Sequence, residues 1–137
     1  GERYDGDVQH VFDDLYVYSI KKNRWRSVKS PTQPLPRCGH SSVVREKFNG
    51  QMFVFGGEYS SRGASVFRHY GDMWLLHLED MKWECIYDGS PEKKSIASSG
   101  GGISANIPTP RSGHRMAIVG KNIVLYGGFH DNGRGVP

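Results

Sequence analysis

The sequence predicts an all-β fold made of repeated antiparallel units, and three observations support that prediction. An apolar stretch that runs directly into two glycines occurs twice, at Met52–Gly57 and Ile123–Gly128, and Gly1 reads as the end of a third copy. The chain holds 18 glycines, 7 prolines and 12% aromatic residues, a composition typical of a turn-rich β protein. The residues around the glycine pairs recur as well. Glycine weakens a strand and marks a sharp turn or a close approach of two backbones, so two such pairs in matching surroundings indicate an internal repeat.

A tryptophan-containing hairpin occurs twice, and every position of the second copy follows its equivalent in the first at the same separation. Residues 14–20 are rich in β-branched and aromatic side chains, and a charged turn leads from them to Trp25. The same pattern returns at 72–78, with a turn at 79–82 and then Trp83. Short apolar runs bounded by polar turns are typical of β-hairpins. Each copy is therefore predicted to form two antiparallel strands, the second of which begins at its tryptophan.

An Arg-x-Gly-His element opens the other half of the repeat. Its two copies lie further apart than the hairpins do, because the segment between tryptophan and arginine is longer in the second copy. A strand follows each histidine and returns through a tight turn, which Asn49-Gly50 predicts to be a two-residue type I′ turn in the first copy. The returning strand ends in the glycine pair. The element consists of Arg37, Gly39 and His40 in the first copy and of Arg111, Gly113 and His114 in the second.

One repeat therefore contains four antiparallel strands in meander order, with no helix longer than a turn or two. The strands are expected at Ser41–Val44, Met52–Phe55, Asp72–Leu78 and Trp83–Ile86. The second and third are apolar on consecutive residues, which indicates that both of their faces are covered. A radial stack gives this result, because each sheet lies between two neighbouring sheets. Repeats of about 45 to 50 residues with four strands are typical of β-propeller blades.

Taken in register, these features resemble the kelch repeat. The residues that carry the resemblance are the Arg-x-Gly-His elements, the glycine pairs Gly56-Gly57 and Gly127-Gly128, the aromatic positions Tyr70 and Trp74, and Trp83. More narrowly, the stretches 55–59, 69–74, 113–116 and 127–130 are similar to the kelch domain-containing protein 4 group. The resemblance implies a fragment of a kelch β-propeller, with one complete four-stranded antiparallel blade flanked by two half-blades.

The repeat divides the chain into four parts. These are the second half of a kelch blade at 1–30, a complete blade at 36–86, a Ser/Gly-rich insertion loop at 87–109 and the first half of the next blade at 110–137. A propeller closes with about 4 to 8 blades, and unclosed blades expose apolar faces and strand edges. We therefore expect a segment of a longer protein whose remaining blades complete the ring.

Composition narrows the class of protein. The net charge of +4 is modest, and no apolar run approaches the roughly 20 residues of a membrane-spanning helix. The sequence shows no secretory leader. Its two cysteines are too few for a disulfide framework, and Cys38 aligns with Ser112 in the other copy, so the fold does not need a thiol there. We expect an intracellular protein, cytoplasmic first and nuclear second.

Histidine and cysteine residues show no catalytic or metal-binding pattern. His40 and His114 occupy equivalent places in successive blades, so they belong to separate sites. We expect the arginine and histidine of each element to bond backbone carbonyls at the start of a blade. The other histidines lack the spacing of zinc ligands, and Cys85 is expected to be a buried small apolar residue. No catalytic residue, cofactor or metal ion is predicted.

Three other features favour a structural role over ligand binding. Trp25 and Trp83 could form a platform for sugars or bases, but their equivalent positions indicate packing between blades. The glycine-rich stretch 99–103 lacks the Gly-Lys-Ser/Thr end of a phosphate-binding loop, so a flexible insertion is expected. The basic cluster at 21–29 could touch phosphates. Its equivalent turn at 79–82 is acidic, which favours a solvated turn.

The resemblance to the kelch family implies a protein–protein interaction module that binds a protein or peptide partner. The residues themselves predict no enzyme activity, no nucleic-acid binding and no membrane binding. Fold alone does not decide function, and two alternatives stay open. A substrate-receptor domain of a ubiquitin ligase would need an adaptor-binding helix outside this segment. A propeller enzyme of the copper-oxidase type would need Tyr, His and Cys ligands that converge at the propeller axis.

The long connections fall on one side of the predicted sheet. In an antiparallel meander, successive connections alternate between the two ends, which groups 1–13, 57–71, 87–109 and 128–137 at one end. These segments carry six cations against eight carboxylates, whereas the short turns opposite carry seven cations against three. Long loops on a rigid scaffold often hold binding residues, and aromatic residues and arginine dominate interface hot spots. The predicted partner-binding residues are Tyr4, Tyr59, Arg62, Phe67, Arg68 and His130.

Overall fold

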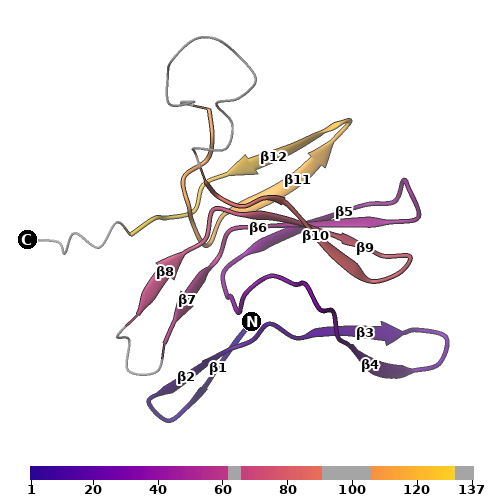
Figure 1. Cartoon of the computed structure of the whole chain (residues 1–137), viewed down its shortest axis with the longest axis horizontal. Helices are drawn as coiled ribbons and strands as arrows, with labels where there is room; N and C mark the ends of the chain where they lie inside the picture. Colours follow the sequence, from indigo (N-terminus) through magenta and orange to yellow (C-terminus); the bar gives the residue numbers. More distant parts are fainter. Residues whose placement is uncertain (62–65, 91–105, 132–137) are drawn as a thin grey trace, which may run out of the picture.

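Twelve β-strands and no helix occur in the part of the chain that the computed structural model describes, residues 1–61, 66–90 and 106–131 (Figure 1). The all-β prediction is therefore confirmed. The Ser/Gly-rich stretch at 95–105, part of the expected insertion loop, lies outside the described residues. In chain order the strands are β1 (Glu2–Asp5), β2 (Val8–Val11), β3 (Leu15–Ser19), β4 (Arg24–Val28), β5 (Ser41–Arg45), β6 (Gln51–Phe55), β7 (Glu58–Ser60), β8 (Phe67–His69), β9 (Met73–His77), β10 (Lys82–Tyr87), β11 (Arg115–Val119) and β12 (Asn122–Tyr126).

The central sheet contains four antiparallel strands in the spatial order β10-β9-β6-β5. β5 and β6 pair with Ser41 opposite Phe55, and β6 and β9 pair with Gln51 opposite His77. Each of the four strands begins and ends within one residue of its predicted bounds, so the predicted complete blade is present. Cys85 on the outermost strand β10 is exposed. The expectation that its thiol is buried is therefore wrong, because strand side chains project from the faces of a sheet and no other described element covers the face of β10 at Cys85.

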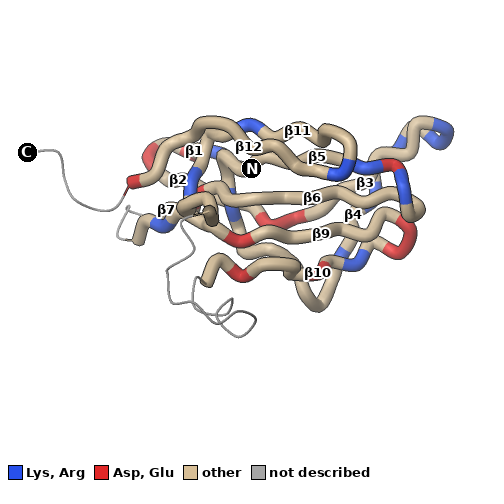
Figure 2. The backbone as a smooth tube through the Cα atoms, turned by 90° about the horizontal axis from the view of Figure 1, so that it is seen from above, with Lys and Arg blue, Asp and Glu red and all other residues tan. Residues whose placement is uncertain are grey.

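A two-stranded sheet lies on either side of this blade. β3 and β4 precede it, and β11 and β12 follow it, with β11 packed alongside β5 (Figures 1 and 2). The β3–β4 and β9–β10 hairpins turn in the same way. Asn23 (φ 48°) and Met81 (φ 59°), which occupy equivalent places in the two hairpins, both adopt the left-handed conformation. The two-stranded sheets are thus the second half of one blade and the first half of another.

The hydrophobic core lies in the two middle strands of the complete blade. Val54 and Phe55 in β6 and Leu75 and Leu76 in β9 are buried. In β3 and β12, which are the equivalent strands of the half-blades, every second side chain is more exposed than its neighbours. The consecutive apolar pattern predicts burial on both faces, and that burial is found where a neighbouring blade and a complete sheet are present.

The long connections between second and third strands contain hairpins, which the sequence predicts only as loops. β1 and β2 pair with Glu2 opposite Val11, and β7 and β8 pair with Glu58 opposite His69. Both hairpins project from the same end of the molecule, and β2 contacts β7 (Figure 1). The glycine pair therefore leads into a short two-stranded extension of the blade.

The turn between β5 and β6 is longer than predicted. Five residues, 46–50, separate the two strands, and Phe48, Asn49 and Gly50 all have positive φ. The predicted two-residue turn at Asn49-Gly50 is wrong because the carbonyl of Gly50 is hydrogen-bonded outside the β5–β6 hairpin. This carbonyl accepts a hydrogen bond from the backbone N–H of Leu78 at 3.0 Å, which ties this turn to the end of β9.

Candidate functional site

Two predicted binding residues lie directly opposite each other in the β7–β8 hairpin. Tyr59 of β7 pairs with Arg68 of β8, so both side chains project from the same face of the hairpin. The hairpin belongs to what we call the long-loop face, the described residues 1–13, 57–61, 66–71, 87–90, 106–109 and 128–131. The sheet thus presents an aromatic ring and a guanidinium together, on a short and regular element.

Tyr59 and Arg68 line a cavity of about 260 Å³, the β7–β8 groove, together with Leu35, Pro36, Val66 and Tyr70. The rim is apolar and accessible, since Leu35 is 53% and Val66 48% exposed. Among the described residues, no carboxylate lies within salt-bridge distance of Arg68. The groove therefore combines apolar surface with a cation that has no acidic partner in this part of the chain.

The floor of the groove is a fixed aromatic ring. Tyr70 is buried, and its hydroxyl donates to the carbonyl of Pro36 at 3.2 Å. The Arg37 guanidinium lies 4.2 Å from the centre of the Tyr70 ring, a cation–π contact. Burial raises the pKa of the Tyr70 phenol, which keeps it neutral. The base of the groove is thus held by the blade itself.

The other predicted binding residues are spread over the same face. Phe67 is 46% exposed and meets the His69 ring edge-on, with ring centres 4.9 Å apart. The His130 ring lies 5.4 Å from that of His69, and Tyr4 stands 64% exposed on the neighbouring β1–β2 hairpin. Arg62 lies outside the described residues. The structure thus brings Tyr59 and Arg68 into one groove and places Phe67 and His130 around His69.

A buried polar cluster, not predicted from the sequence, fixes the β7–β8 hairpin to the following half-blade. His69 Nε2 lies 3.2 Å from Ser112 Oγ and 3.3 Å from Glu58 Oε2, and Ser112 Oγ donates to that carboxylate. The backbone N–H of Asp131 donates to His69 Nδ1 at 3.3 Å. Ser112 and the side chain of His69 are each only 1% exposed. The hairpin that carries the groove is therefore anchored at its base.

This cluster does not have the arrangement of a hydrolase triad. In a triad, the histidine accepts the proton of the serine. Here Nδ1 of His69 accepts from a backbone N–H, so in the neutral ring Nε2 carries the hydrogen and cannot take the Ser112 proton. Ser112 instead donates to Glu58, and it is buried. The arrangement supports a structural role, and we call the cluster of Glu58, His69 and Ser112 the clamp.

A repeat-level signal for this clamp does exist in the sequence. Glu58 follows the glycine pair and Glu2 follows Gly1, and Cys38 and Ser112 both precede the glycine of the Arg-x-Gly-His element. In the structure, burial, followed by the Glu2 and Glu58 carboxylates, raises the pKa of the Cys38 thiol to about 11. The acidic residue of one blade thus lies against the Ser or Cys of the next blade in both copies, and the raised pKa keeps the Cys38 thiol protonated.

The arginines of the repeat bind backbone carbonyls, as expected. Arg37 Nη1 donates to the carbonyl of Gly56 at 2.9 Å, and Arg111 Nη1 donates to that of Gly127 at 3.0 Å. Arg37 also forms a bidentate pair with Asp72, at 2.7 and 2.8 Å. Each arginine thereby ties the start of the first strand to the end of the second.

The second glycine of each pair is required by a close approach of two backbones. Gly57 has a φ of 97°, and a Cβ atom there would lie 2.7 Å from the carbonyl oxygen of Cys38. At Gly128 the φ is 87°, and a Cβ would lie 2.6 Å from the carbonyl oxygen of Ser112. No other residue fits without a shift of the backbone. The glycine pair therefore serves the turn into the hairpin.

The two motif histidines have different surroundings. His114 is fully buried, and its ring lies edge-on to Phe55 of the preceding blade, with centres 5.4 Å apart. Within the described ranges, neither ring nitrogen has a hydrogen-bond partner. The expected bond to a carbonyl is therefore wrong for His114, because the ring is used for packing between blades. Burial, followed by the nearby Arg111 charge, lowers the pKa of His114. The backbone of Phe55 acts to raise this pKa but does not reverse the shift. His40 is exposed.

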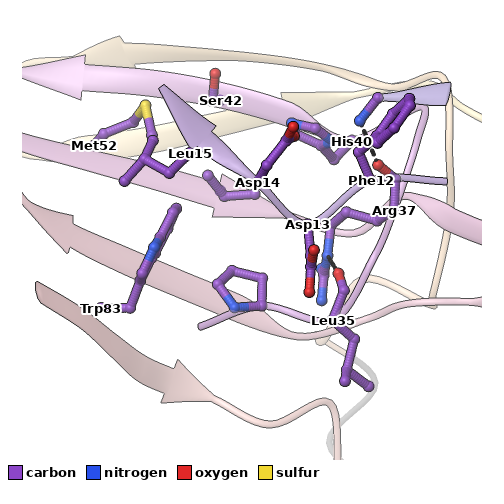
Figure 3. A pocket seen from close by; sticks show the side chains of 13 residues that line it. Phe12, Asp13, Asp14, Leu15, Leu35, Arg37, His40, Ser42, Met52 and Trp83 are labelled. Atoms are coloured by element: carbon purple, nitrogen blue, oxygen red, sulfur yellow. Dashed lines mark hydrogen bonds between the residues drawn. The ribbon is translucent and has the colours of Figure 1, made fainter. Parts of the chain in front are cut away.

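Trp83 lies at the boundary between the complete blade and the preceding half-blade. It lines a cavity of about 240 Å³ there together with Met52 of its own blade and Leu15 of β3 (Figure 3). This position agrees with the expected packing between blades. Trp25, its equivalent, is 67% exposed and packs on Tyr18, with ring centres 5.0 Å apart. Trp25 of the half-blade is thus exposed, whereas its equivalent in the complete blade, Trp83, is partly covered.

Lysine and arginine gather at the end of the molecule opposite the long-loop face, in and beside the β3–β4, β5–β6 and β9–β10 turns (Figure 2). Some of these cations are already engaged. Lys82 pairs with Asp80 at 2.8 Å, and the Arg45 guanidinium lies 5.0 Å from the ring centre of Phe48. The basic side chains are therefore separated from the β7–β8 groove by the length of the blade. In the described ranges, no helix could cross a membrane, and no three His, Cys, Asp or Glu side chains are grouped so as to hold a metal ion.

Comparison with known proteins agrees with this architecture. Residues 1–135 match the family described as the KLHDC2/KLHL20/DRC7 Kelch-repeats domain. The chain is 30% identical over 128 residues to Host cell factor homolog hcf-1 of Caenorhabditis elegans, and 29% identical over 136 residues to Host cell factor 2 of Homo sapiens. These alignments cover 90% and 93% of this chain but only 14% of the length of each relative. Because the family match spans nearly the whole sequence and the repeat elements form the blade described above, the chain belongs to the kelch-repeat family.

Proposed function

We propose that this chain binds a protein or peptide partner through its long-loop face, with the β7–β8 groove at the centre of the contact. Kelch-repeat domains are in general protein–protein interaction modules rather than enzymes. The observation that supports this site is the pairing of Tyr59 with Arg68 over an apolar groove of about 260 Å³. Tyrosine and arginine are the residue types that most often dominate binding energy at protein interfaces.

The rigidity of the groove supports the proposal as well. Its floor, Tyr70, is held by Pro36 and Arg37, and its hairpin is anchored through Ser112. A preformed site loses little conformational entropy when a partner binds. The partner would supply an apolar side chain for the groove and an acceptor for Arg68.

Other aspects of the function are also proposals. We place the chain in the kelch domain-containing protein 4 group and in the cytoplasm, on sequence grounds alone. Further blades would complete a ring around the described blade, because a kelch propeller needs about 4 to 8 blades. The ubiquitin-ligase receptor alternative makes a separate prediction, namely that ligase subunits are captured together with a longer form of the protein.

The test is to identify a partner by affinity capture and mass spectrometry and then to compare two double variants by calorimetry. Tyr59→Ala with Arg68→Ala should weaken binding by at least about 30-fold, the equivalent of one hot spot of about 2 kcal/mol. The control, Lys22→Ala with Lys47→Ala, alters exposed cations at the opposite end and should leave the Kd within about twofold. A loss of affinity in the lysine variant alone would place the partner on the other face.

A further inference from the structure

We propose that the end of the molecule opposite the long-loop face docks on an anionic membrane surface, with Phe48 as its apolar contact. This end is formed by the β3–β4, β5–β6, β9–β10 and β11–β12 turns, and the proposal is independent of the partner-binding groove. The sequence predicts no membrane binding because it holds no apolar run long enough to span a bilayer. Binding at a membrane surface needs no such run, since an apolar contact and a basic patch act together there.

The turns at this end point away from neighbouring blades. In a propeller, the neighbouring blades cover the two faces of a sheet, whereas the hairpin turns point along the strands and out of the ring. The four turns lie at the end opposite the β1–β2 and β7–β8 hairpins (Figures 1 and 2). Further blades of a longer chain would therefore lie beside this end and leave it open.

Phe48 occupies a strained and exposed position in the β5–β6 turn. The residue is 73% exposed, and its φ of 57° is one that bulky side chains rarely adopt. The β5–β6 turn has five residues, 46–50, whereas the equivalent β11–β12 turn has two, 120–121, so the repeat does not need the longer form. Strained backbone is concentrated at functional sites. The longer turn thus presents an aromatic ring to solvent at an energetic cost.

The blade braces this turn. Asn49 Nδ2 donates to Glu79 Oε2 at 2.9 Å, which ties the β5–β6 turn to the β9–β10 turn. The Arg45 guanidinium lies 5.0 Å from the ring centre of Phe48, and its Nε donates to Gln51 Oε1 at 3.1 Å. A contact that is already in place loses little conformational entropy on binding. The ring is therefore held ready outside the blade.

Unpaired cations accompany the ring at this end. Lys82 pairs with Asp80 at 2.8 Å, but among the described residues no carboxylate lies within salt-bridge distance of the other basic side chains. Each lysine or arginine near an anionic membrane adds to binding. The other basic side chains in and beside the four turns are Lys21, Lys22, Arg24, Arg45, Lys47 and Lys121, and the carboxylates there are Glu46, Glu79 and Asp80.

The shape of this end favours a broad partner. Its cations come from separate hairpins of three successive blades rather than from one groove (Figure 2). An apolar side chain among cations is the composition of surfaces that lie on anionic membranes, and the cytoplasmic leaflet is anionic. This agrees with the cytoplasmic location proposed above. The long-loop face would then point away from the membrane, with its groove open to a protein partner.

The test is co-sedimentation of the chain with phosphatidylcholine vesicles that contain about 30% phosphatidylserine, at about 0.1 M salt. Lys22→Ala with Lys47→Ala should weaken binding about 30-fold, because each cation near the surface contributes about fivefold. Phe48→Asn should weaken binding about tenfold, the effect of partial burial of a phenylalanine ring. Asparagine tolerates the left-handed conformation, so this variant should be at least as stable as the unmodified chain in urea unfolding.

Two controls separate this surface from other modes of binding. Vesicles of phosphatidylcholine alone should bind the chain at least about tenfold more weakly, and about 0.5 M salt should remove most of the binding to anionic vesicles. Tyr59→Ala with Arg68→Ala, at the opposite end, should leave vesicle binding within about twofold, so failure of this proposal leaves the groove untouched.

Three results would overturn the proposal. The first is equal binding to neutral and anionic vesicles, and the second is unchanged binding of a folded Phe48→Asn variant. The third is binding to polyglutamate without binding to anionic vesicles, which would assign this end to an acidic polypeptide.

Discussion

Arg37 and Arg111 occupy the same position of the repeat in different surroundings. Replacement of each by methionine therefore compares how much the same arginine stabilises the fold in the two places. The Arg37 side chain is 4% exposed and forms its bidentate pair with Asp72, whose side chain is 15% exposed. Asp72 also accepts a hydrogen bond from Trp74 Nε1 at 2.7 Å. Arg37→Met would leave that carboxylate largely buried with one remaining side-chain donor. Removal of one partner from a buried ion pair costs about 3 to 5 kcal/mol.

Arg111 is the matched control. It makes hydrogen bonds to Thr109 and Gly127, but no carboxylate lies within salt-bridge distance of it among the described residues. Its bonds are solvent-exposed, so Arg111→Met should cost only about 1 kcal/mol. Urea unfolding followed by tryptophan fluorescence measures both free energies of unfolding.

The double variant Arg37→Met with Asp72→Asn separates the loss of the pair from the loss of the arginine. It also removes the charge of the Asp72 carboxylate, which is left unpaired in Arg37→Met, and should recover part of the stability lost in that single variant. Equal losses for the two arginines, or a double variant less stable than Arg37→Met alone, would contradict the reasoning.

Two further predictions concern packing between blades. Trp83→Ala should lower the free energy of unfolding by about 3 kcal/mol, the lower end of the range for a large aromatic, because the ring already borders a cavity. Lys22→Ala, at an exposed turn, should change it by less than about 0.5 kcal/mol, and denaturant midpoints in the reverse order would show that the tryptophan is not part of the core. Since burial lowers the pKa of His114, the unfolded chain binds more protons than the folded one below about pH 6.5, so stability should fall as the pH is lowered through that value. His114→Phe should reduce this pH dependence in unfolding experiments between pH 7 and 5, and an unchanged slope would mean that another group is responsible.

The strands of the complete blade could be predicted from the sequence because burial on both faces demands consecutive apolar residues. β6 and β9 show this pattern, and the matching positions of the repeat copies located their partner strands within one residue. The arginine bonds followed from the motif for a similar reason. Arg37 and Arg111 each stand just before the first strand of a blade, and the repeat places the same glycine carbonyl, at the end of the second strand, near each.

The hairpins of the long-loop face could not be predicted in the same way. β7 and β8 have three residues each and mix polar with aromatic side chains, so no alternation identifies them. The clamp beneath them joins Glu58 and His69 to Ser112 in the next half-blade, and only the packing of blades brings these side chains together. The groove could be anticipated as a region, through Tyr59 and Arg68, but its depth and floor depend on the buried position of Tyr70.

Hydrogen–deuterium exchange with a captured partner tests most directly whether the long-loop face is the binding face. At a saturating concentration of partner, amide exchange should slow in 57–61 and 66–70, which form the β7–β8 hairpin and the edge of its groove. Exchange in the turns at 45–51 and 79–82 should stay unchanged, because they lie at the opposite end of the blade. Protection confined to those two turns, with none in the hairpin, would contradict the proposed function.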